Sequence, residues 1–340
     1  MDLTARRCDL HLKHSFTISR SSREVVPTVI VGIGDAGLIG WGEASPSARY
    51  GETVDSVTDF LTGIGFSRFG EAFRLEDILG AVGAYRPGNT AAKAAVDIAL
   101  HDLLGKKIGL PLWKLWGLNR DNTPVTSLTI GIDRPEIVVQ KVREAEDFPI
   151  LKVKAGGPND REMIGAIRGI TPKPLRVDAN EGWKSREEAL EMILWLEEQG
   201  AELVEQPMPD ACLDDIAWLR ERVHVPLIAD ESVKTLSDIP RIRGAFDGIN
   251  IKLMKCTGLR EALRMIHAAR AMEMKVMLGC MIESSIGISA AAQLSPLADY
   301  ADLDGNVLIS DDPFTGVGIE GGKLVLSDLP GIGVKPNTRL

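Results

Sequence analysis

Cysteines are few in this sequence, and long apolar runs are missing. The 340 residues include only four cysteines, which lie far apart and form no Cys-x-x-Cys pair. They are too few to stabilise a chain of this length with disulfides, which favours a reducing compartment, the cytoplasm. No apolar stretch approaches the ~18 residues that a membrane helix needs, and the first residues carry charges where a secretory signal would be apolar. We therefore expect a cytoplasmic chain with no membrane partner.

An excess of positive charge is also missing. The 39 Lys and Arg residues against 48 Asp and Glu residues give a formal net charge of −9. Binding to nucleic acid needs clustered Lys and Arg, so we expect no nucleic-acid partner. The content of 44% hydrophobic and 26% charged residues is typical of a globular protein. The length suits one domain of about 250 residues with a smaller one beside it.

From about residue 123 onward, short β-rich runs alternate with stretches of helical spacing. Polar residues near the ends of these runs recur about every 25 residues, which is enough for one strand, one helix and two loops. This alternation predicts a parallel sheet, and eight such runs predict a closed (β/α) barrel. A leucine-rich solenoid has a similar period, but its L-x-x-L-x-L signature is absent. The eight runs are PVTSLTIGI, PILKVKAGG, LRVDAN, AELVEQP, VPLIADES, GINIKLMK, KVMLGCMIES and YADLDGN.

The first part of the chain follows a different pattern. Residues 28–34 and 38–44 predict a β-hairpin around a Gly-Asp-Ala-Gly turn, and residues 89–104 predict a helix. We therefore predict an α+β domain over residues 1–118 and the barrel over residues 119–318. The tail, residues 319–340, contains a short strand-like piece that is expected to pack back onto the first domain.

Three acidic residues occupy corresponding positions on successive units. Asp178, Glu205 and Asp230 each follow an apolar run, and such positions converge at the C-terminal mouth of a barrel. Any one of them alone could be a helix N-cap or a partner for a surface arginine. Three carboxylates in phase would repel one another unless a cation lies between them. Because Mg²⁺ prefers oxygen ligands, we predict a magnesium site here.

Three lysines lie within runs that otherwise resemble buried strands. Lys152 and Lys154 alternate on one strand, so both side chains point to the same face, and Lys252 lies across the barrel from Lys154. The alternative is a set of surface lysines on an edge strand, but a closed barrel has no edge strands. Lysines are seldom buried without partners, and the carboxylates with their metal would provide them.

This arrangement predicts a proton-transfer reaction. A substrate carboxylate bound to the metal would place its α-carbon between Lys154 and Lys252, which would exchange acid and base roles. Lys152 and the metal would stabilise the negative charge of the enediolate. They would also lower the pKa of Lys154, so that its neutral amine can act as a base at neutral pH. Two bases on opposite faces of one carbon invert its configuration.

At these residues the sequence resembles the enolase superfamily and, within it, the muconate-lactonising subgroup. Such sites combine a Lys or His base with Mg²⁺. The resemblance implies a modified TIM barrel, (β/α)7β, in which the first domain is an N-terminal α+β capping domain completed by the C-terminal tail. The motifs that carry it extend along nearly the whole chain, in the order WGEASP, LKVKAG, VDANEGW, VEQPMP, IADES, NIKLMKCTGL, LGCMIES and ADLDG.

Within the subgroup, the sequence resembles dipeptide epimerases of the Ala-Glu type most. The resemblance implies that Asp302 and Asp304, in an Asp-x-Asp at the eighth strand end, bind the free α-ammonium of a dipeptide. Two acidic residues outside the phase of the metal ligands suit a cationic group. The alternative for Asp304 is an ordinary Asp-Gly turn. The sequence departs from the pattern at Cys256-Thr257-Gly258 and at Asn306, neither of which belongs to the predicted chemistry.

Further substrate contacts are implied by the resemblance. A basic residue in a loop of the first domain would contact the second carboxylate of the substrate, and Arg20 fits best, with Arg23 as the alternative. Tyr50 belongs to a second loop that would cover the site. Both loops could equally be surface turns. Cys280 and Ile282, at the seventh strand end, would also contact the substrate, and Cys280 has no accompanying histidine that would make it a nucleophile.

The expected activity is therefore a Mg²⁺-dependent isomerase that epimerises the C-terminal residue of a dipeptide such as L-Ala-L/D-Glu. Alternatives are a dipeptide epimerase of other side-chain specificity, an N-acylamino acid racemase or an o-succinylbenzoate synthase. A barrel without catalytic activity is a fourth alternative, although such a barrel would have no reason to keep three lysines and three ligands. The resemblance also implies a homo-oligomer, either a dimer or an octamer.

Overall fold

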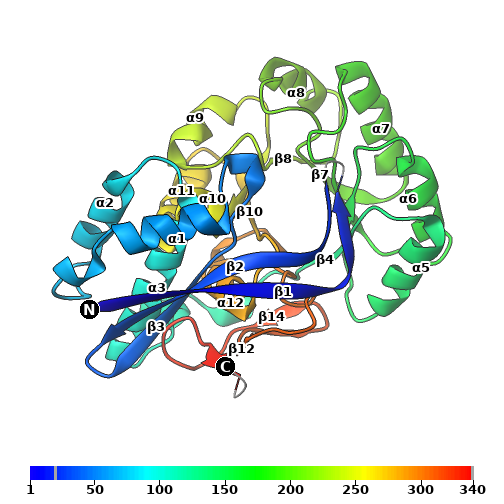
Figure 1. Cartoon of the computed structure of the whole chain (residues 1–340). Coiled ribbons are helices and arrows are strands. Elements are labelled where there is room, and N and C mark those ends of the chain that lie inside the picture. The colour runs from blue at the N-terminus through cyan, green and yellow to red at the C-terminus, as the bar shows by residue number, and fades with distance from the viewer. Residues whose placement is uncertain (19–20, 338–340) are drawn as a thin grey trace.

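The computed structural model describes residues 1–18 and 21–337, and its centre is a barrel of eight parallel strands in sequence order (Figure 1). Each predicted run contains one of these strands, so the predicted fold class is confirmed. The barrel strands are β4 (Leu128–Ile130), β5 (Leu151–Lys154), β6 (Leu175–Asp178), β7 (Ala201–Glu205), β8 (Leu227–Ala229), β9 (Gly248–Lys252), β10 (Lys275–Gly279) and β11 (Tyr300–Asp302).

A backbone bridge and two hydrogen bonds to side chains close the barrel between its first and last strands. Thr126 and Ala301 form a single parallel bridge. Beyond it, the Leu303 N–H donates to the Thr126 hydroxyl at 2.8 Å, and the Thr129 N–H donates to the Asp304 carboxylate at 2.6 Å. The carboxylate of Asp304 thus accepts a bond that a neighbouring strand would otherwise provide, which fixes the end of the eighth strand against the first.

Helices surround the barrel as the alternating pattern predicts. The Ser185 hydroxyl accepts from the Glu188 N–H at the start of one helix, and the Glu188 carboxylate accepts from the Lys184 N–H just before it. The helices are α5 (Pro135–Glu144), α6 (Asp160–Arg168), α7 (Arg186–Glu198), α8 (Leu213–Arg220), α9 (Ile239–Ile242), α10 (Leu253–Cys256), α11 (Leu259–Ala271) and α12 (Ser285–Ala292), with short 3-10 turns η3 (Arg120–Asn122), η4 (Leu236–Asp238) and η5 (Ser295–Leu297).

The N-terminal part packs a three-stranded antiparallel sheet against helices. The predicted hairpin and helix are present, but the long first strand was not predicted. Gly42 lets the sheet lie directly on the central helix, because a Cβ there would fall 2.0 Å from the Ala95 carbonyl oxygen. The elements are β1 (Asp2–Ile18), β2 (Ser21–Asp35), β3 (Leu38–Ala44), η1 (Ala48–Tyr50), α1 (Val54–Gly63), η2 (Phe66–Arg68), α2 (Leu75–Tyr85), α3 (Thr90–Ile108) and α4 (Leu112–Leu115).

The tail after the barrel contains four short strands, β12 (Phe314–Thr315), β13 (Gly318–Glu320), β14 (Lys323–Val325) and β15 (Lys335–Pro336). It contacts both parts of the molecule. The Ile332 N–H donates to the Asp102 carboxylate at 2.9 Å, and the Thr126 N–H donates to the Gly322 carbonyl at 2.8 Å. The exact domain boundaries remain a prediction.

Buried carboxylates attach the N-terminal part to the barrel. Glu43 accepts from the Ser284 and Gly287 N–H groups at the start of α12, and Asp97 accepts from the Leu259 N–H at the start of α11. A carboxylate at a helix N-terminus satisfies free N–H groups and interacts favourably with the helix dipole. These contacts hold β1 and β2 in front of the barrel (Figure 1).

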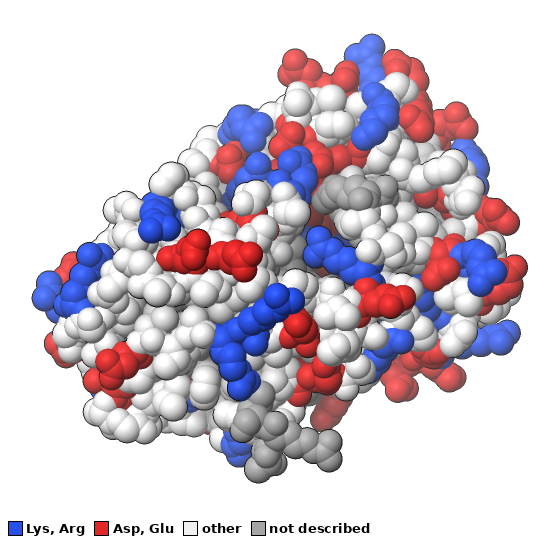
Figure 2. Space-filling model, viewed as in Figure 1, with Lys and Arg blue, Asp and Glu red and all other residues white. Residues whose placement is uncertain are grey.

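Charged side chains of both signs are spread over the surface. On the face shown in Figure 2, acidic and basic side chains of the described residues are interspersed. Within residues 1–18 and 21–337, no helix is both long and apolar enough to cross a membrane.

Candidate active site

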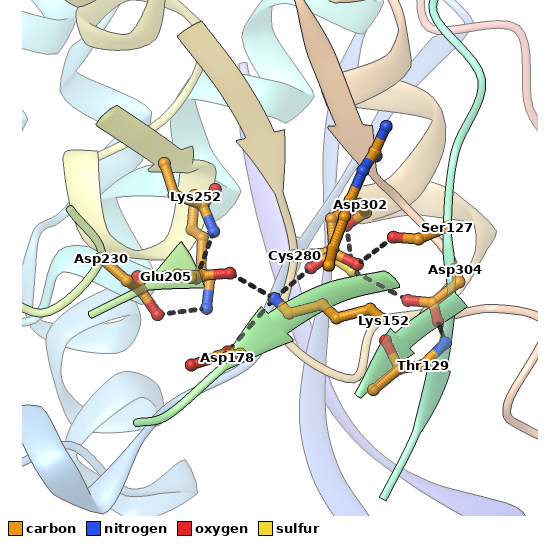
Figure 3. A network of polar contacts seen from close by, with 12 residues as sticks. Ser127, Thr129, Lys152, Asp178, Glu205, Asp230, Lys252, Cys280, Asp302 and Asp304 are labelled. Carbon is orange, nitrogen blue, oxygen red and sulfur yellow. Dashed lines mark hydrogen bonds and ion pairs between the residues drawn. The ribbon is translucent and has the colours of Figure 1, made fainter. Parts of the chain in front are cut away.

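The three predicted acidic residues meet at the C-terminal mouth of the barrel (Figure 3). Asp178 and Glu205 end β6 and β7 and pair directly in the sheet register, and Asp230 follows β8. All three are buried, and their carboxylate oxygens lie within 4.8 Å of one another. Three converging carboxylates fit a hard divalent cation such as Mg²⁺, because they offer oxygen ligands and leave positions for water or substrate.

The predicted lysines point into the same mouth and balance this negative charge. The Lys152 ammonium lies 2.7 Å from the Glu205 carboxylate and 3.2 Å from that of Asp178. Lys154 contacts Asp178 at 2.6 Å, and Lys252 contacts Asp230 at 2.7 Å. The pattern of alternation placed Lys152 and Lys154 on one face, and both are buried inside the barrel.

These contacts set the protonation of the groups. Burial opposes the charged form of Asp178, but Lys154 and Lys152 outweigh it and hold the pKa of Asp178 below its usual range. Burial and the Asp178 charge raise the pKa of Glu205 to about 7. Burial would lower the pKa of Lys152 and Lys252, but the carboxylates beside them raise it well above its ordinary value. A divalent cation that takes up the carboxylate charge would remove this effect.

Two residues that the sequence analysis missed orient the acidic groups. The buried Lys255 ammonium lies 2.5 Å from one carboxylate oxygen of Asp230 and 2.6 Å from its carbonyl oxygen. The Asn250 amide donates to one oxygen of Glu205 at 2.7 Å. Asn250 lies two residues before Lys252 on β9, so alternation along the strand could have identified it. Lys255 follows one turn of helix after Lys252, where the strand pattern no longer applies.

The two acidic residues at the eighth strand end lie beside the lysines. Asp302 contacts the Lys152 ammonium at 2.6 Å and accepts from the Ser127 hydroxyl at 2.9 Å. Burial and the charge of Asp302 raise the pKa of Asp304 to about 6. Asp304 also forms a turn, since its carbonyl accepts from the Val307 N–H, but its carboxylate lines the site. Asp304 therefore forms the turn through its backbone and lines the site with its side chain.

A cavity of about 290 Å³ joins these groups, near the lower end of the ~300–1,000 Å³ typical of ligand sites. Arg23, Tyr50, Cys280 and Ile282 line it together with the three lysines, Asp230, Asp302 and Asp304. Burial and the charge of Asp304 raise the pKa of the Cys280 thiol well above its ordinary value, which agrees with a packed residue and not a nucleophile. Arg20 lies outside the described residues.

Comparison with known proteins identifies the family. Residues 2–117 match the N-terminal domain of mandelate racemase / muconate lactonizing enzyme, and residues 137–340 match the family described as enolase C-terminal domain-like. The chain belongs to this family, so the resemblance drawn from the sequence is confirmed. It is 54% identical to the L-Ala-D/L-Glu epimerase of Bacteroides thetaiotaomicron, over 98% of this chain and 88% of the relative.

Two solved structures have the same fold over nearly their whole length. The substrate-liganded L-Ala-D/L-Glu epimerase of Bacillus subtilis has a TM-score of 0.92 and 31% identity, with 98% of each chain covered. The dipeptide epimerase of Enterococcus faecalis complexed with Mg and the dipeptide L-Leu-L-Tyr has a TM-score of 0.90 and 34% identity, with 98% of each chain covered.

The lysine–carboxylate contacts predict how stability depends on Mg²⁺. Replacing Lys152 by Met leaves Glu205 and Asp302 without this cation, and losing one partner of buried ion pairs costs about 3–5 kcal/mol. Without Mg²⁺, we expect Lys152→Met to have a lower melting temperature than the wild type, measured by calorimetry. On adding Mg²⁺, the melting temperature of the variant should rise by more than that of the wild type. The exposed Lys275 provides the matched control, Lys275→Met, which should behave like the wild type. An equal rise in melting temperature on adding Mg²⁺ to Lys152→Met and to the wild type would contradict this prediction.

Proposed function

We propose that this protein is a Mg²⁺-dependent dipeptide epimerase that inverts the α-carbon of the C-terminal residue. The observation that carries this proposal is that Lys154 and Lys252 face one cavity from opposite sides of the barrel. β5 and β9 are separated by three strands in the eight-stranded order. A substrate carbon between them can lose a proton on one face and gain one on the other.

In this proposal Asp178, Glu205 and Asp230 hold Mg²⁺, which supplies a Lewis acid for the α-carboxylate of the substrate. Lys154 removes the α-proton of one epimer as the α-carbon–hydrogen bond breaks, and Lys252 delivers a proton to the opposite face. The two lysines exchange these roles for the other epimer. The Lys152 ammonium stabilises the negative charge that develops on the substrate oxygens.

Asp302 and Asp304 favour a dipeptide over an N-acylated substrate. Both are buried carboxylates beside the cavity, and the free α-ammonium of a dipeptide would provide a counter-charge. The substrates of an N-acylamino acid racemase or an o-succinylbenzoate synthase have no such ammonium. Arg23 lines the cavity and can bind a side-chain carboxylate. Arg20, which the resemblance favours for this contact, lies outside the described residues. L-Ala-L/D-Glu is therefore our leading substrate, with a dipeptide of other side chains as the alternative.

The proposal also includes the cellular compartment, the domain boundaries and the assembly of the enzyme. The four cysteines are free thiols, which supports a reducing cytoplasm. We also propose a capping domain over residues 1–118 with 319–340, a barrel domain over 119–318, and assembly as a homo-oligomer, either a dimer or an octamer.

The proposal predicts Mg²⁺-dependent exchange of the α-hydrogen of glutamate in L-Ala-L-Glu for deuterium in D₂O, followed by mass spectrometry. Since only the dipeptide carries the ammonium, its kcat/KM should exceed that of N-succinyl-glutamate by at least ~10-fold, from one charge-assisted contact. A preference for the succinylated compound would favour the racemase alternative. Absence of exchange with any dipeptide would favour a barrel without catalytic activity.

The raised pKa of Asp304 predicts that kcat/KM falls at acidic pH. Its pKa is raised to about 6, so its carboxylate is charged above that pH and becomes neutral as the pH falls through it. Because only the charged form attracts the substrate ammonium, kcat/KM for L-Ala-L-Glu should reach half of its plateau at about pH 6, rise to the plateau at higher pH and fall further at lower pH. Asp304→Asn should lower kcat/KM at neutral pH and remove this fall. A fall near pH 6 that persists unchanged in Asp304→Asn would rule out the assignment.

A further inference from the structure

A second cavity, of about 150 Å³, lies beside the first and has no role in the proton transfer. The two cavities share four lining residues, Leu12, Phe16, Thr129 and Leu308. The second cavity lies between β1, the end of β4 and the loop after β11. We call it the side cavity.

The walls of the side cavity are mainly apolar. Leu128 and Ile130 come from β4, Val307 and Leu308 from the loop after β11, and Leu12 and Phe16 from β1. Of the charged residues around it, Lys13 is exposed, and three others form ion pairs. His14 pairs with Glu144 at 2.6 Å, and the Lys141 ammonium lies 3.0 Å from the Asp133 carboxylate. The side cavity therefore suits an uncharged, apolar group.

Three residues that line the side cavity form hydrogen bonds with Asp304. The Asp304 carboxylate accepts from the Thr129 N–H at 2.6 Å, and its carbonyl accepts from Val307 and Leu308 at 2.8 and 3.3 Å. Thr129, Val307 and Leu308 are three of the lining residues. In a dipeptide held by its ammonium at Asp304, the α-carbon of the N-terminal residue is one bond from that nitrogen. Its side chain thus begins at the junction of the two cavities.

We infer that the side cavity binds the side chain of the N-terminal residue of the dipeptide. An apolar cavity of ~150 Å³ holds a molecule the size of benzene, so this site accepts residues as large as leucine or phenylalanine. The inference rests on the proposed function and extends it: the chain is not restricted to alanine at the N-terminal position.

The test compares L-Leu-L-Glu with L-Ala-L-Glu by kcat/KM. In the wild type, the leucine dipeptide is expected to be used at least as well as the alanine dipeptide. Val307→Phe fills the side cavity and should lower the leucine-to-alanine ratio by at least ~10-fold, since even one methylene in an apolar pocket is worth 10–200-fold. Val307→Leu fills it less and should shift the ratio in the same direction by less. The matched control is Val325→Phe on β14, where Val325 is 41% exposed and lines neither cavity.

Two results overturn the inference while leaving the proposed function intact. One is a wild-type enzyme that exchanges and epimerises L-Ala-L-Glu but has a kcat/KM for L-Leu-L-Glu that is lower by more than ~10-fold. The other is an unchanged ratio in both folded Val307 variants, which would place the N-terminal side chain elsewhere. If no dipeptide at all exchanges its α-hydrogen, the proposed function fails and the inference fails with it.

Discussion

The site depends on a balance of buried charge at the mouth of the barrel. Four carboxylates, of Asp178, Glu205, Asp230 and Asp302, are in contact with four lysines, Lys152, Lys154, Lys252 and Lys255. Burying such groups is costly, and apolar residues in their place would often give equal or greater stability. Their presence therefore points to chemistry. A divalent cation would take over the carboxylate charge and free the lysine amines for proton transfer.

The barrel and the N-terminal part of the chain have different roles at this site. The barrel strands supply the reacting groups, which sit on rigid elements with their side chains fixed by ion pairs. The N-terminal part covers the site, because β1 and β2 extend over the mouth; β1 lines both cavities and β2 lines the first. Glu43 and Asp97 fix that cover to the start of α12 and α11. Selectivity can thus change through the cover while the chemistry of the barrel stays constant.

The sequence predicts those features that follow a local period. The strand–helix alternation identifies the barrel, and the common phase of Asp178, Glu205 and Asp230 identifies the acidic cluster. β1 was missed although Cys8, Leu10, Leu12, Phe16 and Ile18 alternate along it, because most of its residues are polar and exposed and Leu10 is its only buried residue. The bond between Thr129 and Asp304 joins residues 175 positions apart, so no local pattern indicates it. Lys255 was missed because its side chain reaches back from a short helix.

The most direct test of the two-lysine arrangement uses Lys154→Ala and Lys252→Ala with both epimers of L-Ala-Glu in D₂O. If each lysine serves one face, each variant exchanges the α-hydrogen of one epimer only, the two variants choose opposite epimers, and neither interconverts them. Epimerisation at the wild-type rate in either variant, or exchange of the same epimer in both, would contradict the arrangement of Lys154 and Lys252 on opposite faces of the substrate carbon.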